Sequence, residues 1–233
     1  MSEPPLRGED HTELMTHSNP AAVVLAGGLG TRMRSKTPKH FHQLLGRRMV
    51  DWVVEAARSV AADPVVVVTS PDGANRFDGI EVAVQAEPLG TGDALASARG
   101  ALNGIGGDLL VLSGDTPTLS PELLQELLET HRREDAAATV LSFRPADPRQ
   151  YGRVIRDDSG SVQAIVEAGD ASPEQLAVGE VNSSIYVFDA GRMWPALEQL
   201  DPSNRQGELY LTDAVRNLVE NGERVAAYVA PDP

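Results

Sequence analysis

The chain of 233 residues contains no cysteine and no apolar run that approaches the length of a membrane span. The missing cysteine excludes disulfide frameworks, thiolate catalysis and zinc sites with cysteine ligands. Residues 1–20 also lack the hydrophobic stretch of a secretory signal peptide. We therefore expect a cytoplasmic protein that does not bind membranes, with 41% hydrophobic residues available to build its core.

Basic residues are also scarce, because 20 lysines and arginines stand against 34 acidic residues and give a net charge of −14. Such a balance argues against nucleic-acid partners, since neutralising phosphates requires exposed cations. Only two lysines occur, Lys36 and Lys39, and the segment from Arg32 to Arg48 is basic without a single acid. Two interpretations stay open: a basic segment placed for an anion, or a solvated loop in a protein that prefers arginine to lysine.

The pattern of hydrophobic residues predicts an α/β fold. Residues 1–20 have no apolar period, so they are predicted to be a disordered leader. Short β-branched runs typical of buried parallel strands follow at 21–26, 64–69, 80–85 and 108–113. Helical patterns lie between them at 49–61, 91–102 and 121–134, with Thr91 and Ser120 as predicted N-caps. This alternation predicts a doubly wound, mostly parallel sheet.

The second half of the sequence is less regular. Strands are expected at 137–143, 153–156, 162–167, 180–189 and 224–230, and helices near 190–200 and 209–221. We interpret this half as mixed strands that extend the same sheet, so that residues 21–233 form one domain.

A glycine-rich loop follows the first strand, at the edge where open α/β sheets bind ligands. Gly27, Gly28 and Gly30 allow the backbone to turn tightly and to present N–H groups to an anion. The loop is not a dinucleotide fingerprint, because Met33 stands where that motif needs a small residue, and it is not a P-loop. Arg32 and Lys39 lie on the long excursion after it and suit a polyphosphate.

Asp115 follows the strand at 108–113 in the run Ser113-Gly114-Asp115. A carboxylate at this edge suits Mg²⁺, which takes one or two protein oxygens and keeps several waters. Position alone equally allows Asp115 to cap the turn through Thr116 and Pro117.

These segments together resemble the signature of sugar-1-phosphate nucleotidyltransferases. The resemblance is closest to the uridyltransferase half of bacterial bifunctional N-acetylglucosamine-1-phosphate uridyltransferases, and it covers residues 21–230. The matching segments are LAGGLGTRM (25–33), SKTPKHFH (35–42), QAEPLGTG (85–92), SGDTP (113–117), YGRV (151–154), IVE (165–167), EVN (180–182) and QGELYLTD (206–213).

The resemblance implies a Rossmann-like enzyme that makes UDP-N-acetylglucosamine and pyrophosphate from UTP and N-acetylglucosamine 1-phosphate, a precursor step of the bacterial cell wall. It implies Arg32 and Lys39 as catalytic cations and Asp115 as a Mg²⁺ ligand. It also assigns nucleotide contacts to Leu25, Ala26, Gly27, Gly28, Gln85, Gly90 and Thr91, and sugar contacts to Ser113, Gly114, Gly152, Glu167 and Asn182. His40 and His42 are expected to be structural.

Three departures from the family pattern bear on these expectations. Ser184 stands where the family commonly has glycine, and Gly169 stands where it has lysine. No hexapeptide repeats occur, so we expect no acetyltransferase activity and a monomer or weak oligomer. The family's second metal ligand, an asparagine, would come from a segment beyond Pro233. Transfer to another acceptor, such as glucose 1-phosphate or a molybdenum-cofactor precursor, and a UDP-sugar-binding protein with little turnover remain alternatives.

Overall fold

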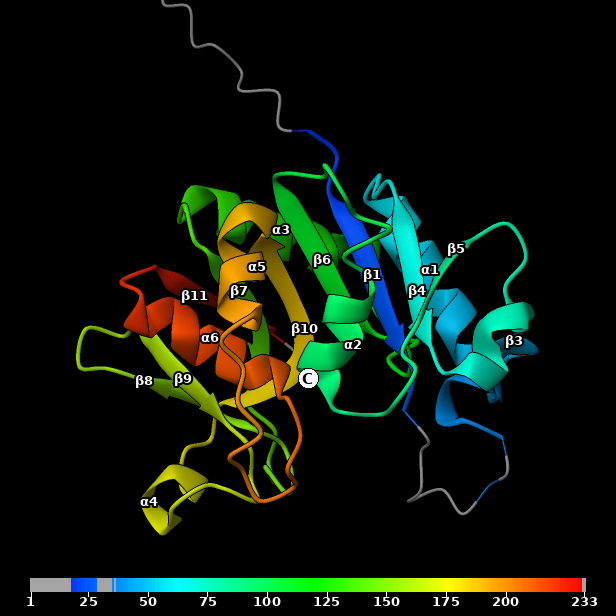
Figure 1. Cartoon of the computed structure of the whole chain (residues 1–233). Coiled ribbons are helices and arrows are strands. Elements are labelled where there is room, and N and C mark those ends of the chain that lie inside the picture. Colours follow the sequence, from blue (N-terminus) through cyan, green and yellow to red (C-terminus); the bar gives the residue numbers. More distant parts are fainter. Residues whose placement is uncertain (1–17, 29–34, 36, 232–233) are drawn as a thin grey trace, which may run out of the picture.

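The computed structural model describes residues 18–28, 35 and 37–231. Within these ranges nine strands form one open sheet, and helices cover both of its faces (Figure 1). The predicted α/β class is confirmed. The predicted leader at 1–17, Arg32 and Lys36 lie outside the described residues.

The centre of the sheet is parallel and comes from the first half of the sequence. Its strands are β1 (Ala21–Ala26), β4 (Val65–Thr69), β5 (Glu81–Val84) and β6 (Asp108–Ser113). β1 lies between β4 and β6, and Val24 is paired with Val67 on one side and Leu112 on the other. Helices pack on both faces of these strands, which explains why their sequences are apolar without alternation.

The second half adds β7 (Ala138–Phe143), β8 (Arg153–Arg156), β9 (Val162–Val166), β10 (Val181–Asp189) and β11 (Val225–Val229). β10 runs antiparallel between β6 and β7, β11 lies parallel to β7, and β8 pairs with β9 and β10. The predicted extension by mixed strands is confirmed. Because β10 is antiparallel to β6, its first residues lie toward the end of β6 where Ser113 is.

Helices pack on the two faces in separate sets. One face carries α1 (Met49–Ser59) and α3 (Pro121–Arg133), and the other carries α2 (Thr91–Ser97), α5 (Ala190–Leu197) and α6 (Leu211–Glu220). Neighbouring residues of β1 serve opposite layers, Val23 packing with α2, α5 and α6 and Val24 packing with α1 and α3. The remaining short elements are η2 (Lys39–Phe41), β2 (Gln43–Leu44), β3 (Arg47–Arg48), η3 (Pro71–Arg76) and α4 (Pro173–Leu176).

The two predicted helix caps have different outcomes. Ser120 caps α3 as predicted, because its hydroxyl accepts a hydrogen bond from the Leu123 N–H at 3.2 Å. The prediction for Thr91 is wrong: Gly90 is the N-cap of α2, and Thr91 is the first residue of that helix. The Thr91 hydroxyl instead accepts from the Leu211 N–H at 3.0 Å, so it satisfies a free donor at the start of α6. The helix also ends at Ser97, five residues before the predicted end.

None of the helices in the described part of the chain is long and apolar enough to cross a lipid bilayer.

Candidate functional site

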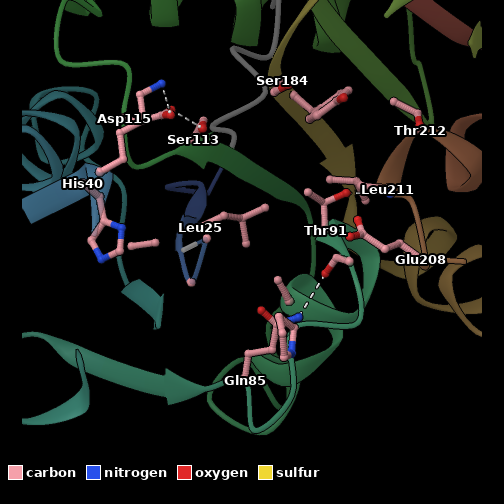
Figure 2. A pocket seen from close by; sticks show the side chains of 18 of the residues that line it. Leu25, His40, Gln85, Thr91, Ser113, Asp115, Ser184, Glu208, Leu211 and Thr212 are labelled. Carbon is pink, nitrogen blue, oxygen red and sulfur yellow. Dashed lines mark hydrogen bonds and ion pairs between the residues drawn. The ribbon is translucent and has the colours of Figure 1, made fainter. Parts of the chain in front are cut away.

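A cavity of about 500 Å³ opens at the carboxyl edge of β1 and β6 (Figure 2). Strand ends and the loops that follow them supply one side, and the N-terminal regions of α2 and α6 supply another. Its lining is Leu25, Ala26, Gly27, Gly28, Lys39, His40, Gln85, Pro88, Gly90, Thr91, Ala94, Ser113, Asp115, Glu167, Ser184, Tyr186, Glu208, Leu211 and Thr212.

Gln85 is buried at one end of this cavity, in a fixed orientation. Its Nε2 donates to the Gly90 carbonyl at 3.0 Å and to Asp93 Oδ2 at 2.8 Å. Both partners are acceptors only, so the amide nitrogen must point toward them. The other atom, Oε1, faces the glycine loop, where a Cβ at Gly27 would come within 2.9 Å of it. Gln85 therefore presents an acceptor beside Gly27.

Two loops that are far apart in sequence, one before α2 and one before α6, pack against each other. Gly90 has a φ of 124°, and a Cβ there would lie 2.4 Å from the Leu209 carbonyl oxygen. Leu209 itself donates to the Leu89 carbonyl and accepts from the Gly92 N–H. Only glycine combines this backbone conformation with this close approach, which gives a structural reason for Gly90 in the loop.

A cation and a carboxylate meet on the opposite side of the cavity. Lys39 Nζ lies 2.7 Å from Asp115 Oδ2, while the Ser113 hydroxyl donates to Asp115 Oδ1 at 2.7 Å. Burial acts to raise the pKa of Asp115, but the hydrogen bonds from Lys39 and Ser113 outweigh it and hold the pKa below its usual value. Asp115 is therefore an ionised carboxylate at neutral pH.

His40 lines the same side and is almost fully buried. Burial lowers the pKa of His40 to about 4; Asp115 opposes this shift, and Arg48 and Arg76 add to it. Its Nε2 has no hydrogen-bond partner among the described residues. The structural role of His40 stays a prediction, and its neutral imidazole faces the cavity.

The third region of the cavity contains Glu167 and Thr212. Burial raises the pKa of Glu167, the Thr212 hydroxyl opposes this by donating to Glu167 Oε1 at 3.3 Å, and Asp170 and Asp213 raise it further. Gly152 packs behind this carboxylate, since a Cβ there would lie 3.5 Å from both Glu167 oxygens.

Asn182 is buried beside this region, and its side chain is already engaged. Its Nδ2 donates to the Tyr186 hydroxyl at 2.7 Å, and its Oδ1 accepts from the Ser184 N–H at 2.9 Å. Asn182 thereby positions two residues that line the cavity, Tyr186 and Ser184.

A metal ion at Asp115 would need further ligands in addition to this one carboxylate. No group of three or more His, Cys, Asp or Glu side chains able to hold a metal occurs among residues 18–28, 35 and 37–231. One carboxylate oxygen completed by waters and phosphate oxygens is the usual environment of Mg²⁺ in phosphoryl-transfer sites. The residues present therefore fit a Mg²⁺ ion that is bound partly by the Asp115 carboxylate and partly by oxygens of the substrate.

Most of the sequence-predicted site residues line this one cavity. Gly114, Gly152 and Asn182 do not line it directly and instead pack behind residues that do. Arg32 lies outside the described residues. Residues that the sequence prediction omitted also line it: Pro88, Ala94, Ser184, Tyr186, Glu208, Leu211 and Thr212. The segment at 206–213 already carried part of this signal, because it matched the family pattern without an assigned role.

The chain resembles known proteins over most of its length. The model of the MobA-like NTP transferase domain matches residues 22–217. The protein named "Bifunctional protein GlmU" of Pelobacter propionicus is 46% identical over 220 residues, which cover 92% of this chain and 48% of that protein. Proteins of the same name from Pelotomaculum thermopropionicum and Corynebacterium aurimucosum are 45% and 43% identical, covering 91% and 93% of this chain and 48% and 47% of theirs. This chain thus spans about half the length of these curated relatives. The match from β1 into α6 shows that the chain belongs to the MobA-like NTP transferase family of nucleotidyltransferases.

Proposed function

We propose that the chain joins UTP and N-acetylglucosamine 1-phosphate to give UDP-N-acetylglucosamine and pyrophosphate. The observation that carries this proposal is that one cavity contains three chemically different regions: the oriented amide of Gln85, the Lys39–Asp115 pair and the polar group around Glu167. These suit a base, a polyphosphate and a sugar respectively. The names of the relatives support the same reaction.

The choice of UTP rests on Gln85. Because Gly90 and Asp93 hold its amide nitrogen, Oε1 is the atom left for the base. Uracil, like guanine, carries a ring N–H that donates to such an acceptor, whereas the ring nitrogen at the pairing edge of cytosine or adenine is unprotonated and only an exocyclic amino group donates there. When an unprotonated ring nitrogen faces Gln85 Oε1, both atoms are acceptors and neither forms a hydrogen bond, so the nucleotide binds less well.

The chemical step needs charge neutralisation more than a base. An oxygen of the sugar phosphate, already ionised at neutral pH, attacks the α-phosphorus of UTP; the bond to the bridging oxygen breaks, and pyrophosphate leaves with that oxygen. The Lys39 side chain is 46% exposed beside Asp115, so its ammonium remains accessible to the departing phosphates. We assign it to neutralise the charge that develops there, with Arg32 in the same role.

We further propose Mg²⁺ as the metal cofactor, held by Asp115. When bound, it would supply positive charge that offsets the negative charge of the substrate phosphates. Ser113 orients the carboxylate by donating to Oδ1. The other oxygen, Oδ2, pairs with Lys39, and we assign this oxygen to the metal ion.

The sugar is assigned to the region of Glu167. This carboxylate accepts hydrogen bonds from sugar hydroxyls, Thr212 and Gly152 fix its position, and Asn182 acts through Tyr186 and Ser184. A sugar phosphate with several hydroxyl groups suits this lining, because the carboxylate and hydroxyl side chains can form hydrogen bonds with several sugar hydroxyls at once.

A second candidate is transfer to a different acceptor, favoured by the match to a domain described as MobA-like. One experiment separates the two. Purified chain with Mg²⁺ is given each of the four ribonucleoside triphosphates with N-acetylglucosamine 1-phosphate, glucose 1-phosphate or the molybdenum-cofactor precursor, and pyrophosphate release is measured. We expect the highest kcat/KM for UTP with N-acetylglucosamine 1-phosphate. Turnover with the precursor alone supports the second candidate, and UDP-sugar binding without turnover makes the chain a binding protein.

A further inference from the structure

Ser184 has a backbone conformation that disfavours every residue except glycine. Its φ is 65°, in the left-handed region, where the Cβ of an L-residue crowds the backbone. Leu45, Ala61, Asp135 and Arg149 are the other non-glycine residues with positive φ in the described part of the chain. Ser184 alone among these five lines the cavity.

The surroundings of Ser184 hold it in this conformation. It lies in β10 where the pairing with β7 shifts register between Asn182 and Tyr186. The Ser184 N–H donates to Asn182 Oδ1 at 2.9 Å, and the neighbouring Ser183 hydroxyl donates to the Leu141 carbonyl at 2.7 Å. Strained conformations that the surrounding structure fixes in this way occur preferentially at functional sites.

The side chain of Ser184 is directed into the cavity. The residue is exposed although its neighbours Ile185 and Tyr186 are buried, and it lines the cavity together with Glu167 and Thr212. Figure 2 shows Ser184 on the same side as Thr212 and well away from Gln85. A glycine here would relieve the strain, but it would leave the space of a hydroxymethyl group open in the part of the cavity assigned to the sugar.

We infer that Ser184 tunes sugar specificity: its side chain narrows, without closing, the space for a ring substituent of the sugar and hydrogen-bonds to a sugar hydroxyl. This inference rests on the proposed function, because it assumes that the acceptor sugar lies beside Glu167. A group of this size in a binding pocket changes discrimination between substrates by about tenfold or more. The chain therefore accepts N-acylated sugars less readily, relative to unsubstituted hexoses, than it would with glycine.

The test compares Ser184→Gly with Ala61→Gly. Ala61 follows α1 with a φ of 58°, so this control also removes a Cβ from a left-handed position, but outside the cavity lining. For each protein the kcat/KM for N-acetylglucosamine 1-phosphate is divided by that for glucose 1-phosphate. Calorimetry gives the same ratio for the Kd values of the two UDP-sugar products.

We expect Ser184→Gly to shift both ratios toward the N-acetylated compound by about tenfold, and Ala61→Gly to leave them unchanged. Ser184→Ala retains the Cβ and should shift them in the same direction by less. Melting temperature should rise in both glycine variants, which shows that the fold is intact. Turnover with unchanged ratios in Ser184→Gly overturns this inference alone. A wild-type chain that turns over no sugar phosphate overturns the proposed function, and this inference with it.

Discussion

Lys39 Nζ and Asp115 Oδ2 lie 2.7 Å apart, although 76 positions separate the two residues in the sequence. Lys39 begins the short helix η2 after the glycine loop, and Asp115 follows β6. The pair links the two segments that we assign to the polyphosphate. Because both side chains keep some exposure, substrate phosphates have access to the pair without unfolding of either segment.

Lys39→Ala should reduce turnover by about 10²–10³-fold, because a placed positive charge stabilises the departing pyrophosphate strongly. Lys36→Ala is the matched control, since it removes the chain's only other lysine, and it should change turnover little. Pyrophosphate release with UTP and a saturating sugar phosphate measures both. Equal losses in the two variants would mean that the segment acts as a general positive field.

Asp93→Asn should reduce the preference for UTP over CTP by about tenfold. The carboxylate of Asp93 and the Gly90 carbonyl both accept from Gln85 Nε2, and the carboxylate supplies the charged half of the pair that fixes which end of the amide faces the base. An asparagine partner allows the Gln85 amide to turn over, because its side chain both donates and accepts. Glu87→Gln, which makes the same type of change at an exposed residue of the loop before α2, is the control. An unchanged kcat/KM ratio for the two nucleotides in Asp93→Asn would show that Gln85 does not choose the base.

Gly90→Ala should destabilise the protein by about 1–3 kcal/mol and weaken UTP binding, since its Cβ would overlap the Leu209 carbonyl in a disfavoured backbone region. Gly100→Ala is the control, because a Cβ there meets nothing within 4 Å and its φ is not positive. Thermal unfolding and UTP calorimetry measure the two effects. Equal melting temperatures for the two variants would contradict the close approach of the loops at 90 and 209.

The ionised carboxylate of Glu180 should stabilise the folded protein at neutral pH but not at acidic pH. Its buried carboxylate accepts from Arg156, from Ser142 and from Arg144. Burial acts to raise the pKa of Glu180, but these hydrogen bonds and the charge of Arg156 outweigh it and lower the pKa below 4.5. The stabilisation is therefore complete above the unfolded-state pKa and is lost as pH falls through the lower folded-state pKa.

Glu180→Gln should cost about 3 kcal/mol at pH 7, because it leaves Arg156 without its carboxylate partner. The cost should shrink as the pH falls below the unfolded-state pKa and through the lower folded-state pKa, because the wild-type carboxyl then becomes protonated as well. Urea unfolding at a series of pH values measures this, with Asp147→Asn at an exposed pair as the control. A cost that stays constant between pH 7 and 3 would rule out ionised Glu180 as its source.

The sequence predicted the central strands well, because a strand covered by helices on both faces must be apolar throughout. β1 and β6 therefore end where the apolar runs end, and the cap at Ser120 follows from local hydrogen bonding. Thr91 shows the limit of such reasoning. Its residue type suits a helix N-cap, but the N–H that reaches its hydroxyl belongs to Leu211, 120 positions away.

The candidate site divides in the same way. The sequence by itself determined the glycine loop, the acid after β6 and the charges of Lys39 and Asp115, because these depend on residue type and on position along one strand. Only the tertiary structure decided that β10 lies beside β6, which brings Ser184 into the cavity lining and Asn182 behind it. It also fixed the direction of the Gln85 amide and the strained backbone of Ser184. The place of β10 arises from pairing with strands distant in sequence. The Gln85 amide and the Ser184 backbone are held by near neighbours in the sequence, but residue types alone do not specify the direction of a side chain or a backbone angle.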